Sequence, residues 1–352
     1  MSQKFDSKSL FKSDSSITIS RVAKPIPKFY ALFSPAEILE IVNSLATKRE
    51  MPVKYSYKGR DGKIWDDFYL KYIALKWYRN INTEIELLKK NFEYIKQYIQ
   101  AGQKVNVIDV GAGNSYPVKE FIAQLDKVGK INKYFALDIS DKLLEVSRKN
   151  FHKWFSNIEF ISSSIDIENN VIPKWILNNQ GNSQTDETVN IILHLGVTIG
   201  NHQNRIAALK NFRDGMSQND LLVLTNELGE NAKWDGIPRG GCKYHAEQIY
   251  KWVKEMLDIQ AADCELIRKY DANIDSVVAN IKFRRSYTIN FNLMNINESI
   301  DIAAGEEITL WRHHKYQISE LIEELAQARL QLVHYNTNQY SSHIMAICQV
   351  AD

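Results

Sequence analysis

Residues 105–116 read VNVIDVGAGNSY, and this stretch decides the fold class. Its first half is an apolar run of the kind that fills a strand buried on both faces of a sheet. The run ends at Asp109, after which Gly111 and Gly113 follow two residues apart. A helical pattern begins at once in 117–125. Strand, glycine turn and helix in this order predict the first unit of a doubly wound nucleotide-binding sheet, because glycine lets the backbone approach a ligand closely.

The residues around these glycines separate two classes of nucleotide cofactor. A dinucleotide fingerprint needs a third glycine where this chain has Tyr116, which argues against NAD. The pattern D-x-G-x-G, with the acid at the end of the strand, favours S-adenosylmethionine. The next apolar run ends at Asp138, whose carboxylate can accept hydrogen bonds from both ribose hydroxyls. We therefore expect S-adenosylmethionine as the cofactor, at a site that includes Asp109, Gly111, Gly113 and Asp138.

Composition limits the partners of the protein. The 352 residues carry 44 basic and 42 acidic side chains and a net charge of +2, so no overall field attracts nucleic acid or an anionic membrane. Three cysteines without a CxxC pair are typical of a reducing compartment. No apolar run approaches the ~20 residues that span a bilayer, and the serine-rich start is unlike a signal peptide. These features predict a cytoplasmic protein, as a monomer or a weak dimer.

Changes of periodicity divide the chain. From 84 to 228 strands and helices alternate as in a Rossmann-like methyltransferase, and that rhythm stops at Gly229. The expected parts are a disordered tail (1–20), the N-terminal part of a substrate domain (21–83), the Rossmann-like domain (84–228), an insertion that belongs to the substrate domain (229–311), and a C-terminal helix and hairpin that complete the methyltransferase sheet (312–352). The predicted fold class is α/β, a Rossmann-like class I methyltransferase sheet with an inserted α+β substrate domain.

Several elements follow from capping and alternation. Ser34 and Glu37 form a capping-box pattern that predicts the start of a helix. Thr83 is expected to begin a long helix that leads into the first strand of the sheet. Alternating residues in 275–283 and 285–294 predict an antiparallel pair of strands. Two apolar segments near the C-terminus predict the closing hairpin.

Further candidate residues follow the other predicted strands. Asp166 comes after the third strand, at a turn that contacts the adenine in this fold. The stretch 189–201 predicts a fourth strand and a loop with Gly196 and Asn201, close to the transferred methyl group. Asn201 is either a substrate ligand or an asparagine tolerated in a tight turn. The aromatic residues of 54–83 form either the core of a helical region or a lid over the cofactor or a cationic substrate.

The assembled motifs resemble the histidine-specific methyltransferase family, whose best-known member trimethylates the histidine α-amine in ergothioneine biosynthesis. The resemblance is carried by KYSYKGRDGKIWDDF (54–68), DVGAGNS with ALDIS, LHLGVTIGN (193–201) and GEEITLWRHHKY (305–316). It implies contacts to S-adenosylmethionine from Tyr57, Gly111, Asp138 and Asp166. It also implies that Tyr78 and Asn201 hold the α-carboxylate and α-amine of an amino-acid-like substrate, and Tyr244 is the nearest counterpart of a further substrate tyrosine.

Departures from the family pattern concern the acceptor. Pro117 stands where the family has a lysine after the glycines. Trp311 and His313 stand where the histidine enzymes offer a glutamate and a serine that grip the imidazole. A buried imidazole N–H without its carboxylate partner would cost ~1–3 kcal/mol. We therefore expect an acceptor other than histidine.

The expected reaction is methylation of the amine of an amino acid or amino-acid derivative, with Tyr78, Asn201 and His313 as catalytic candidates. An amine must arrive unprotonated, and His313 or His314 is the candidate base; adjacent residues of a strand face opposite ways, so at most one faces the site. No third metal ligand follows at a sensible spacing, and no metal is expected.

Two alternatives stay open on the sequence alone. One is an O-methyltransferase for a carboxyl or hydroxyl group of a peptide or secondary metabolite. The other is a non-catalytic binding protein with the methyltransferase fold. Glu306 and Glu307 are expected to hold their strand or to pair with Arg312 and Lys315.

Overall fold

The computed structural model describes residues 20–58, 66–67, 70, 79–177, 188–238, 240–293 and 296–351. The predicted tail therefore lies outside the described residues, except for Ser20. Most of the predicted aromatic lid lies outside them as well, including Tyr78.

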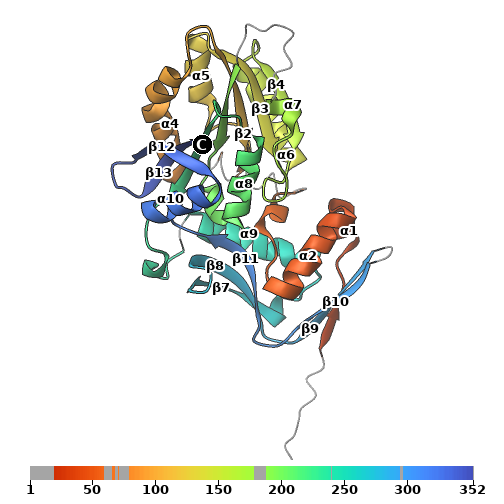
Figure 1. The fold of residues 1–352 in the computed structure, drawn as a ribbon. Coiled ribbons are helices and arrows are strands. Elements are labelled where there is room, and N and C mark those ends of the chain that lie inside the picture. Colours follow the sequence, from red (N-terminus) through yellow and green to blue (C-terminus); the bar gives the residue numbers. More distant parts are fainter. Residues whose placement is uncertain are drawn as a thin grey trace, which may run out of the picture.

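Within the described residues, one sheet of seven strands has the order β12-β13-β6-β5-β2-β3-β4 (Figure 1). Its strands are β2 (Lys104–Val110), β3 (Ile131–Asp138), β4 (Glu159–Ser164), β5 (Thr188–His194), β6 (Leu221–Glu227), β12 (Leu330–Thr337) and β13 (His343–Val350). The first five strands, β2 to β6, are parallel to one another. β13 runs antiparallel to β6 and pairs with β12 as a hairpin. The predicted α/β class and the closing hairpin are confirmed.

Helices cover both faces of this sheet. One face packs against α4 (Arg79–Tyr98), α5 (Lys119–Lys127) and α6 (Asp141–Trp154). The other packs against α7 (Lys174–Leu177), α8 (Arg205–Gly215) and α10 (Ile318–Gln327). Successive residues of β2 alternate between the two cores, Val107 toward the first and Ile108 toward the second. Burial on both faces explains why these strands read as continuous apolar runs.

A second region contributes two smaller sheets, of order β1-β9-β10 and β11-β8-β7 (Figure 1). Its elements are β1 (Arg21–Ala23), α1 (Pro27–Leu32), α2 (Pro35–Lys48), η1 (Val53–Tyr57), α9 (Gly240–Met256), η6 (Ala261–Asp263), β7 (Cys264–Asp271), β8 (Ser276–Phe283), β9 (Tyr287–Leu293), β10 (Ile296–Ile302) and β11 (Glu307–His313). Two stretches far apart in the chain, 23–55 and 242–311, share its hydrophobic core.

Capping patterns gave mixed results. The capping box of α2 is present, since Glu37 N–H donates to Ser34 Oγ and Ser34 N–H donates to Glu37 Oε2. The prediction that Thr83 begins the long helix is wrong, because α4 already includes Arg79. A cap-forming residue is tolerated inside a helix when an apolar face, here with Leu87 and Leu88, packs against the sheet.

The predicted antiparallel pair of 275–283 and 285–294 is also wrong. β8 pairs with β7 and β11, whereas β9 pairs with β1 and β10. Backbone bonds from Phe283 and Gly305 hold the end of β8 against the residues that precede β11. Arg284 N–H donates to the Asp263 carbonyl (2.7 Å), so the chain leaves for another sheet instead of folding back.

A buried ion pair joins the chain just after α2 to strand β11. Arg312 Nε donates to Glu50 Oε1 (3.0 Å) and its second nitrogen donates to Glu50 Oε2. Burial raises the pKa of Glu50 more than Arg312 lowers it. The expected pairing of Glu306 and Glu307 with Arg312 and Lys315 is therefore wrong. Glu306 instead pairs with Arg49, and Glu307 with Lys269.

Arg312→Met should destabilise the protein by ~3–5 kcal/mol, because it leaves the Glu50 carboxylate buried without its partner. The measurement is the free energy of unfolding from denaturant titration. Arg284→Met, at an exposed pair with Glu265, is the matched control and should change little. Equal losses of stability in the two variants would contradict a larger contribution of the Arg312–Glu50 pair.

Candidate active site

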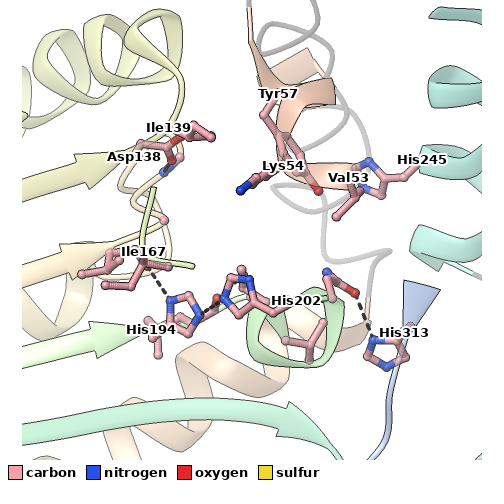
Figure 2. A pocket seen from close by; sticks show the side chains of 18 of the residues that line it. Val53, Lys54, Tyr57, Asp138, Ile139, Ile167, His194, His202, His245 and His313 are labelled. Carbon is pink, nitrogen blue, oxygen red and sulfur yellow. Dashed lines mark hydrogen bonds between the residues drawn. The ribbon is translucent and has the colours of Figure 1, made fainter. Parts of the chain in front are cut away.

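A cavity of about 570 Å³ lies at the carboxyl edge of the parallel strands, within the ~300–1,000 Å³ range of small-molecule sites. The loops after β2, β3, β4 and β5 line one part of it, since the carboxyl ends of parallel strands meet at one edge. The other part is lined by η1, α9, β8 and β11. Figure 2 shows Asp138 and Ile139 facing Lys54, Tyr57 and Val53 across the space.

The structure brings the sequence-predicted cofactor residues together. Those that line the cavity are Tyr57, Asp109, Gly111, Gly113, Asp138, Asp166 and Gly196. Asp138 accepts hydrogen bonds from the Gly113 N–H (3.0 Å) and the Ser140 N–H (2.9 Å). These bonds fix its carboxylate at the turn after β3, toward the space between the two parts of the lining.

Burial raises the pKa values of the acids at this edge of the sheet. It raises the pKa of Asp138 to about 6 and that of Asp109 to about 7, although Tyr134 OH donates to Asp109 (2.7 Å). Gly111 has φ +79° and open space where a Cβ would project. Acceptor oxygens beside an open glycine turn fit a ligand that carries hydroxyl groups, as the ribose of S-adenosylmethionine does.

Lys54 was missed by sequence reasoning. Its ammonium group donates to Asp166 Oδ2 (2.6 Å) and lies 2.6 Å from Glu40 Oε1. Burial lowers the pKa of Lys54, but Asp166 and the neighbouring carboxylates outweigh it and the pKa is raised. Lys54 therefore ties η1 to the turn after β4 that is predicted to contact the adenine. The sequence signal that could have identified Lys54 was its place beside the tyrosines of KYSYKG.

Two buried histidines and a glutamate form a chain of hydrogen bonds under the cavity (Figure 2). His194 Nδ1 donates to the Val110 carbonyl (2.9 Å), and its Nε2 meets His202 Nε2 (3.1 Å). His202 Nδ1 lies 3.0 Å from Glu168 Oε1. Burial lowers the pKa of His194 to about 3, and the pKa of Glu168 is lowered to about 2 because His202 and Lys54 outweigh its burial. His202 thus bridges His194 and Glu168, with one ring nitrogen toward each.

Glu84 holds the loop that follows β5. Its carboxylate accepts the Gly196 N–H (3.0 Å) and the Thr225 hydroxyl (3.0 Å), and burial raises its pKa to about 7. A glutamate in a helical pattern gave no sign of this role in the sequence, because the contact depends on how α4 crosses the sheet.

Asn201, Trp311 and His313 all line the cavity, and Figure 2 shows His313 across the space from Asp138. His313 Nδ1 lies 3.3 Å from Asn201 Oδ1, and its Nε2 lies 3.4 Å from Glu227 Oε2. The rings of Trp311 and His313 stack with centroids 5.9 Å apart. The lining includes His245 of α9 and does not include its neighbour Tyr244, whose place in the site stays a prediction. One helical residue rotates a side chain by about 100°.

His313 and His314 face opposite ways, as strand alternation predicts. His314 Nδ1 donates to the Asp275 carbonyl (2.7 Å), and its Nε2 lies 2.8 Å from Glu320 Oε1. Asp275, His314 and Glu320 bring one ligand atom each within 4.8 Å of one another. Spacing along the sequence did not reveal these neighbours, because Asp275 and Glu320 belong to other elements.

Gly200 permits the close packing that places Asn201 beside His313. A Cβ at Gly200 would overlap the His314 carbonyl oxygen and lie 2.8 Å from Asn226 Oδ1. The His314 N–H donates to the Gly200 carbonyl (2.9 Å), which holds η4 (Thr198–Asn201) against the end of β11.

The sheet order, the glycine turn and the acids at its carboxyl edge define an S-adenosylmethionine-dependent methyltransferase of class I. Residues 38–350 match the family described as "Histidine-specific methyltransferase, SAM-dependent", and the chain belongs to that family. The resemblance inferred from the motifs is thus confirmed. In the described part of the chain, no helix is long and apolar enough to cross a membrane.

Known relatives are distant. The chain is 27% identical over 183 residues to ergothioneine biosynthesis protein 1 of Neurospora crassa; the match covers 50% of this chain and 19% of that protein. A methyltransferase structure from Clostridium acetobutylicum has a TM-score of 0.43 at 11% identity, covering 82% of this chain and 99% of its own. Streptomyces venezuelae DesVI has a TM-score of 0.40 at 11% identity, covering 84% and 100%.

Gly200→Ala should destabilise the protein by ~1–3 kcal/mol, because the added methyl group meets backbone that cannot move away easily. Gly215→Ala is the matched control, since its Cβ would meet the movable end of the Leu177 side chain (2.9 Å). Thermal unfolding midpoints of both variants provide the measurement, and a loss no larger for Gly200 than for Gly215 would refute the expectation.

Proposed function

We propose that the protein N-methylates the amine of an amino acid or amino-acid derivative other than histidine. The observation that carries this proposal is the pair of side chains that β11 presents to the cavity, Trp311 and His313. The family resemblance expects a glutamate and a serine at these two places. An imidazole substrate would leave its N–H without that carboxylate, at a cost of ~1–3 kcal/mol.

Glu227 does not replace the missing carboxylate, because other side chains already contact it. It lies 3.4 Å from His313 Nε2 and 3.4 Å from Lys315 Nζ, and 3.9 Å from His343 Nε2. A substrate imidazole would have to compete with these three groups for the Glu227 carboxylate. The walls nearby are instead apolar or aromatic, with Trp234, Ile237 and Val277. This lining favours an acceptor with an apolar or aromatic side chain.

The cofactor site is proposed from the residues that face the sheet edge. When bound, S-adenosylmethionine supplies a methyl group activated by its sulfonium. Asp138 would accept the ribose hydroxyls, and Asp166 would face the adenine beside Lys54. The other proposed contacts are Tyr57, Asp109, Gly111, Gly113 and Gly196. Methyl transfer of this kind requires alignment and exclusion of water, and the proposal includes no metal.

The acceptor site is proposed around Asn201, which would hold the α-amine and α-carboxylate of the substrate together with Tyr78. Tyr78 lies outside the described residues. Beside the predicted Tyr244, α9 offers His245, whose pKa burial lowers to about 4. His245 is therefore a neutral imidazole at neutral pH, suited to a hydrogen bond with an uncharged part of the acceptor.

Asp138→Asn should weaken binding of S-adenosylhomocysteine on the order of 10- to 100-fold, because hydrogen bonds to a charged acceptor contribute ~1.5–3 kcal/mol. In the wild type, affinity should fall as the pH drops through about 6, where Asp138 takes up a proton. Isothermal titration across this range measures both effects. Asp214→Asn, a surface change on α8, should bind normally. An unchanged affinity in Asp138→Asn would remove this residue from the site.

Mass spectrometry of reactions with S-adenosylmethionine and single amino acids tests the function directly. Incorporation of methyl groups into the amine of tryptophan, tyrosine or another amino acid is the expected result. Turnover of histidine at a higher kcat/KM would overturn the acceptor assignment. Methylation at oxygen would favour the O-methyltransferase alternative. Binding of S-adenosylhomocysteine without turnover of amino acids would redirect the search to peptides and secondary metabolites.

A further inference from the structure

We propose that Glu227 is a positioning residue that fixes the proton of His313 on Nε2, so that Nδ1 takes a proton from the acceptor amine. This inference rests on the proposed function and adds a residue to it, since no sequence motif pointed to Glu227. Glu227 is the last residue of β6, and His313 is the last residue of β11. Both line the cavity.

The charge of Glu227 decides which nitrogen of His313 carries the proton. Burial raises its pKa, but His313, Lys315 and His343 together outweigh burial, and the pKa is lowered. Glu227 is therefore a carboxylate at neutral pH, with Oε2 3.4 Å from His313 Nε2. An anion beside one imidazole nitrogen stabilises the tautomer that carries the proton on that nitrogen. The other nitrogen, Nδ1, then carries the lone pair.

The second step is the direction of Nδ1. It lies 3.3 Å from Asn201 Oδ1, which suits a protonated Nδ1, and a half-turn of the amide presents its nitrogen to a neutral one. The Trp311 ring stacks on the imidazole with an interplanar angle of 22°. The amide of Asn201 can donate from its nitrogen to a neutral Nδ1 or accept with its oxygen from a protonated one. Asn201 therefore accommodates both states of His313, while Glu227 and Trp311 keep the ring in place.

The third step is the chemistry at Nδ1. An α-amine has a pKa of ~8 and arrives mostly as an ammonium group at neutral pH, without a lone pair for attack. One N–H bond of the ammonium breaks, an Nδ1–H bond forms on His313, and the electron pair stays on the amine nitrogen. The resulting imidazolium keeps its Nε2–H toward the Glu227 carboxylate, which stabilises the new charge. Asn201, the proposed amine ligand, puts the acceptor within reach of this base.

Other charged or titratable groups around His313 are compatible with this step. Lys315 follows two residues later and contacts Glu227 (3.4 Å), and His343 of β13 contacts the same carboxylate from the large sheet (3.9 Å). His245 of α9 lines the same cavity and is neutral because burial lowers its pKa to about 4. Among the described neighbours, Glu227 is thus the anion that faces the His313 ring.

Nuclear magnetic resonance of protein labelled with ¹⁵N-histidine tests the proton arrangement without cofactor or substrate. Long-range ¹H–¹⁵N correlations distinguish the two tautomers, and His313→Asn identifies the signal among the 8 histidines. We expect the Nε2–H tautomer for His313 in the wild type. In Glu227→Gln the preference for Nε2–H should be lost, because the anion that stabilises it is gone. An Nδ1–H tautomer in the wild type, or an unchanged tautomer preference in the variant, would overturn the proposal.

Matched variants separate positioning from folding. Glu320→Gln removes the carboxylate beside His314, outside the cavity, and should leave the His313 spectrum and turnover unchanged. Glu227→Asp keeps the charge and should keep part of the wild-type preference for the Nε2–H tautomer. With an amino acid found to be a substrate, Glu227→Gln should lower kcat by ~10²-fold and shift the acidic limb of its pH profile, without changing KM for S-adenosylmethionine. Equal loss in Glu227→Asp and Glu227→Gln would argue against a role of the charge.

The failure of this inference can be told from failure of the proposed function. The tautomer of His313 is read in the protein alone. Wild-type protein that fails to bind S-adenosylhomocysteine would count against the proposed function, whatever the tautomer. Protein that binds S-adenosylhomocysteine and methylates an amino acid with an Nδ1–H tautomer at His313 would count against Glu227 alone.

Discussion

Coverage of the seven-stranded sheet by helices on both faces is the constraint on which the active site depends. With both faces buried, the loops at the carboxyl edge remain accessible to ligands, and parallel pairing delivers four of these loops to the same place. The glycines after β2 leave space at this edge. Asp109 and Asp138, at the carboxyl ends of β2 and β3, are buried there. Their raised pKa values follow from the same packing that stabilises the sheet.

Because side chains alternate along β11, one face of the strand lines the cavity and the other stabilises the fold. Trp311 and His313 face the cavity, whereas Arg312 between them turns to Glu50 just after α2. The ion pair thus sets the rotation of the strand that presents the two acceptor-side residues. Gly200 completes the arrangement, because its lack of a Cβ lets η4 lie against the end of β11 and brings Asn201 to His313.

Local sequence patterns predicted the elements better than their partners. The nucleotide-binding unit, the α2 capping box and the final hairpin were predictable because apolar period, caps and glycines act over a few residues. The separation of β8 from β9 was not, since it depends on backbone bonds to Glu306 and Asp263. In the site, residues in glycine and acid motifs were found, whereas Lys54, Glu84 and Glu227 were missed because their contacts join segments far apart. On α9 the cavity is lined by His245 beside the predicted Tyr244, because one residue along a helix turns a side chain by about 100°.

The contact between Lys54 and Asp166 has a consequence for ligand exchange. It spans the two parts of the cavity lining, so a ligand that seeks the Asp166 carboxylate must share it with an ammonium group or displace that group. Entry and departure at this end would then require an ion pair to open. Because this pair is largely buried, mobile ions screen it much less than a pair on the surface. η1 would in that case hold back the exchange of ligands at this end of the cavity over a wide range of salt concentration.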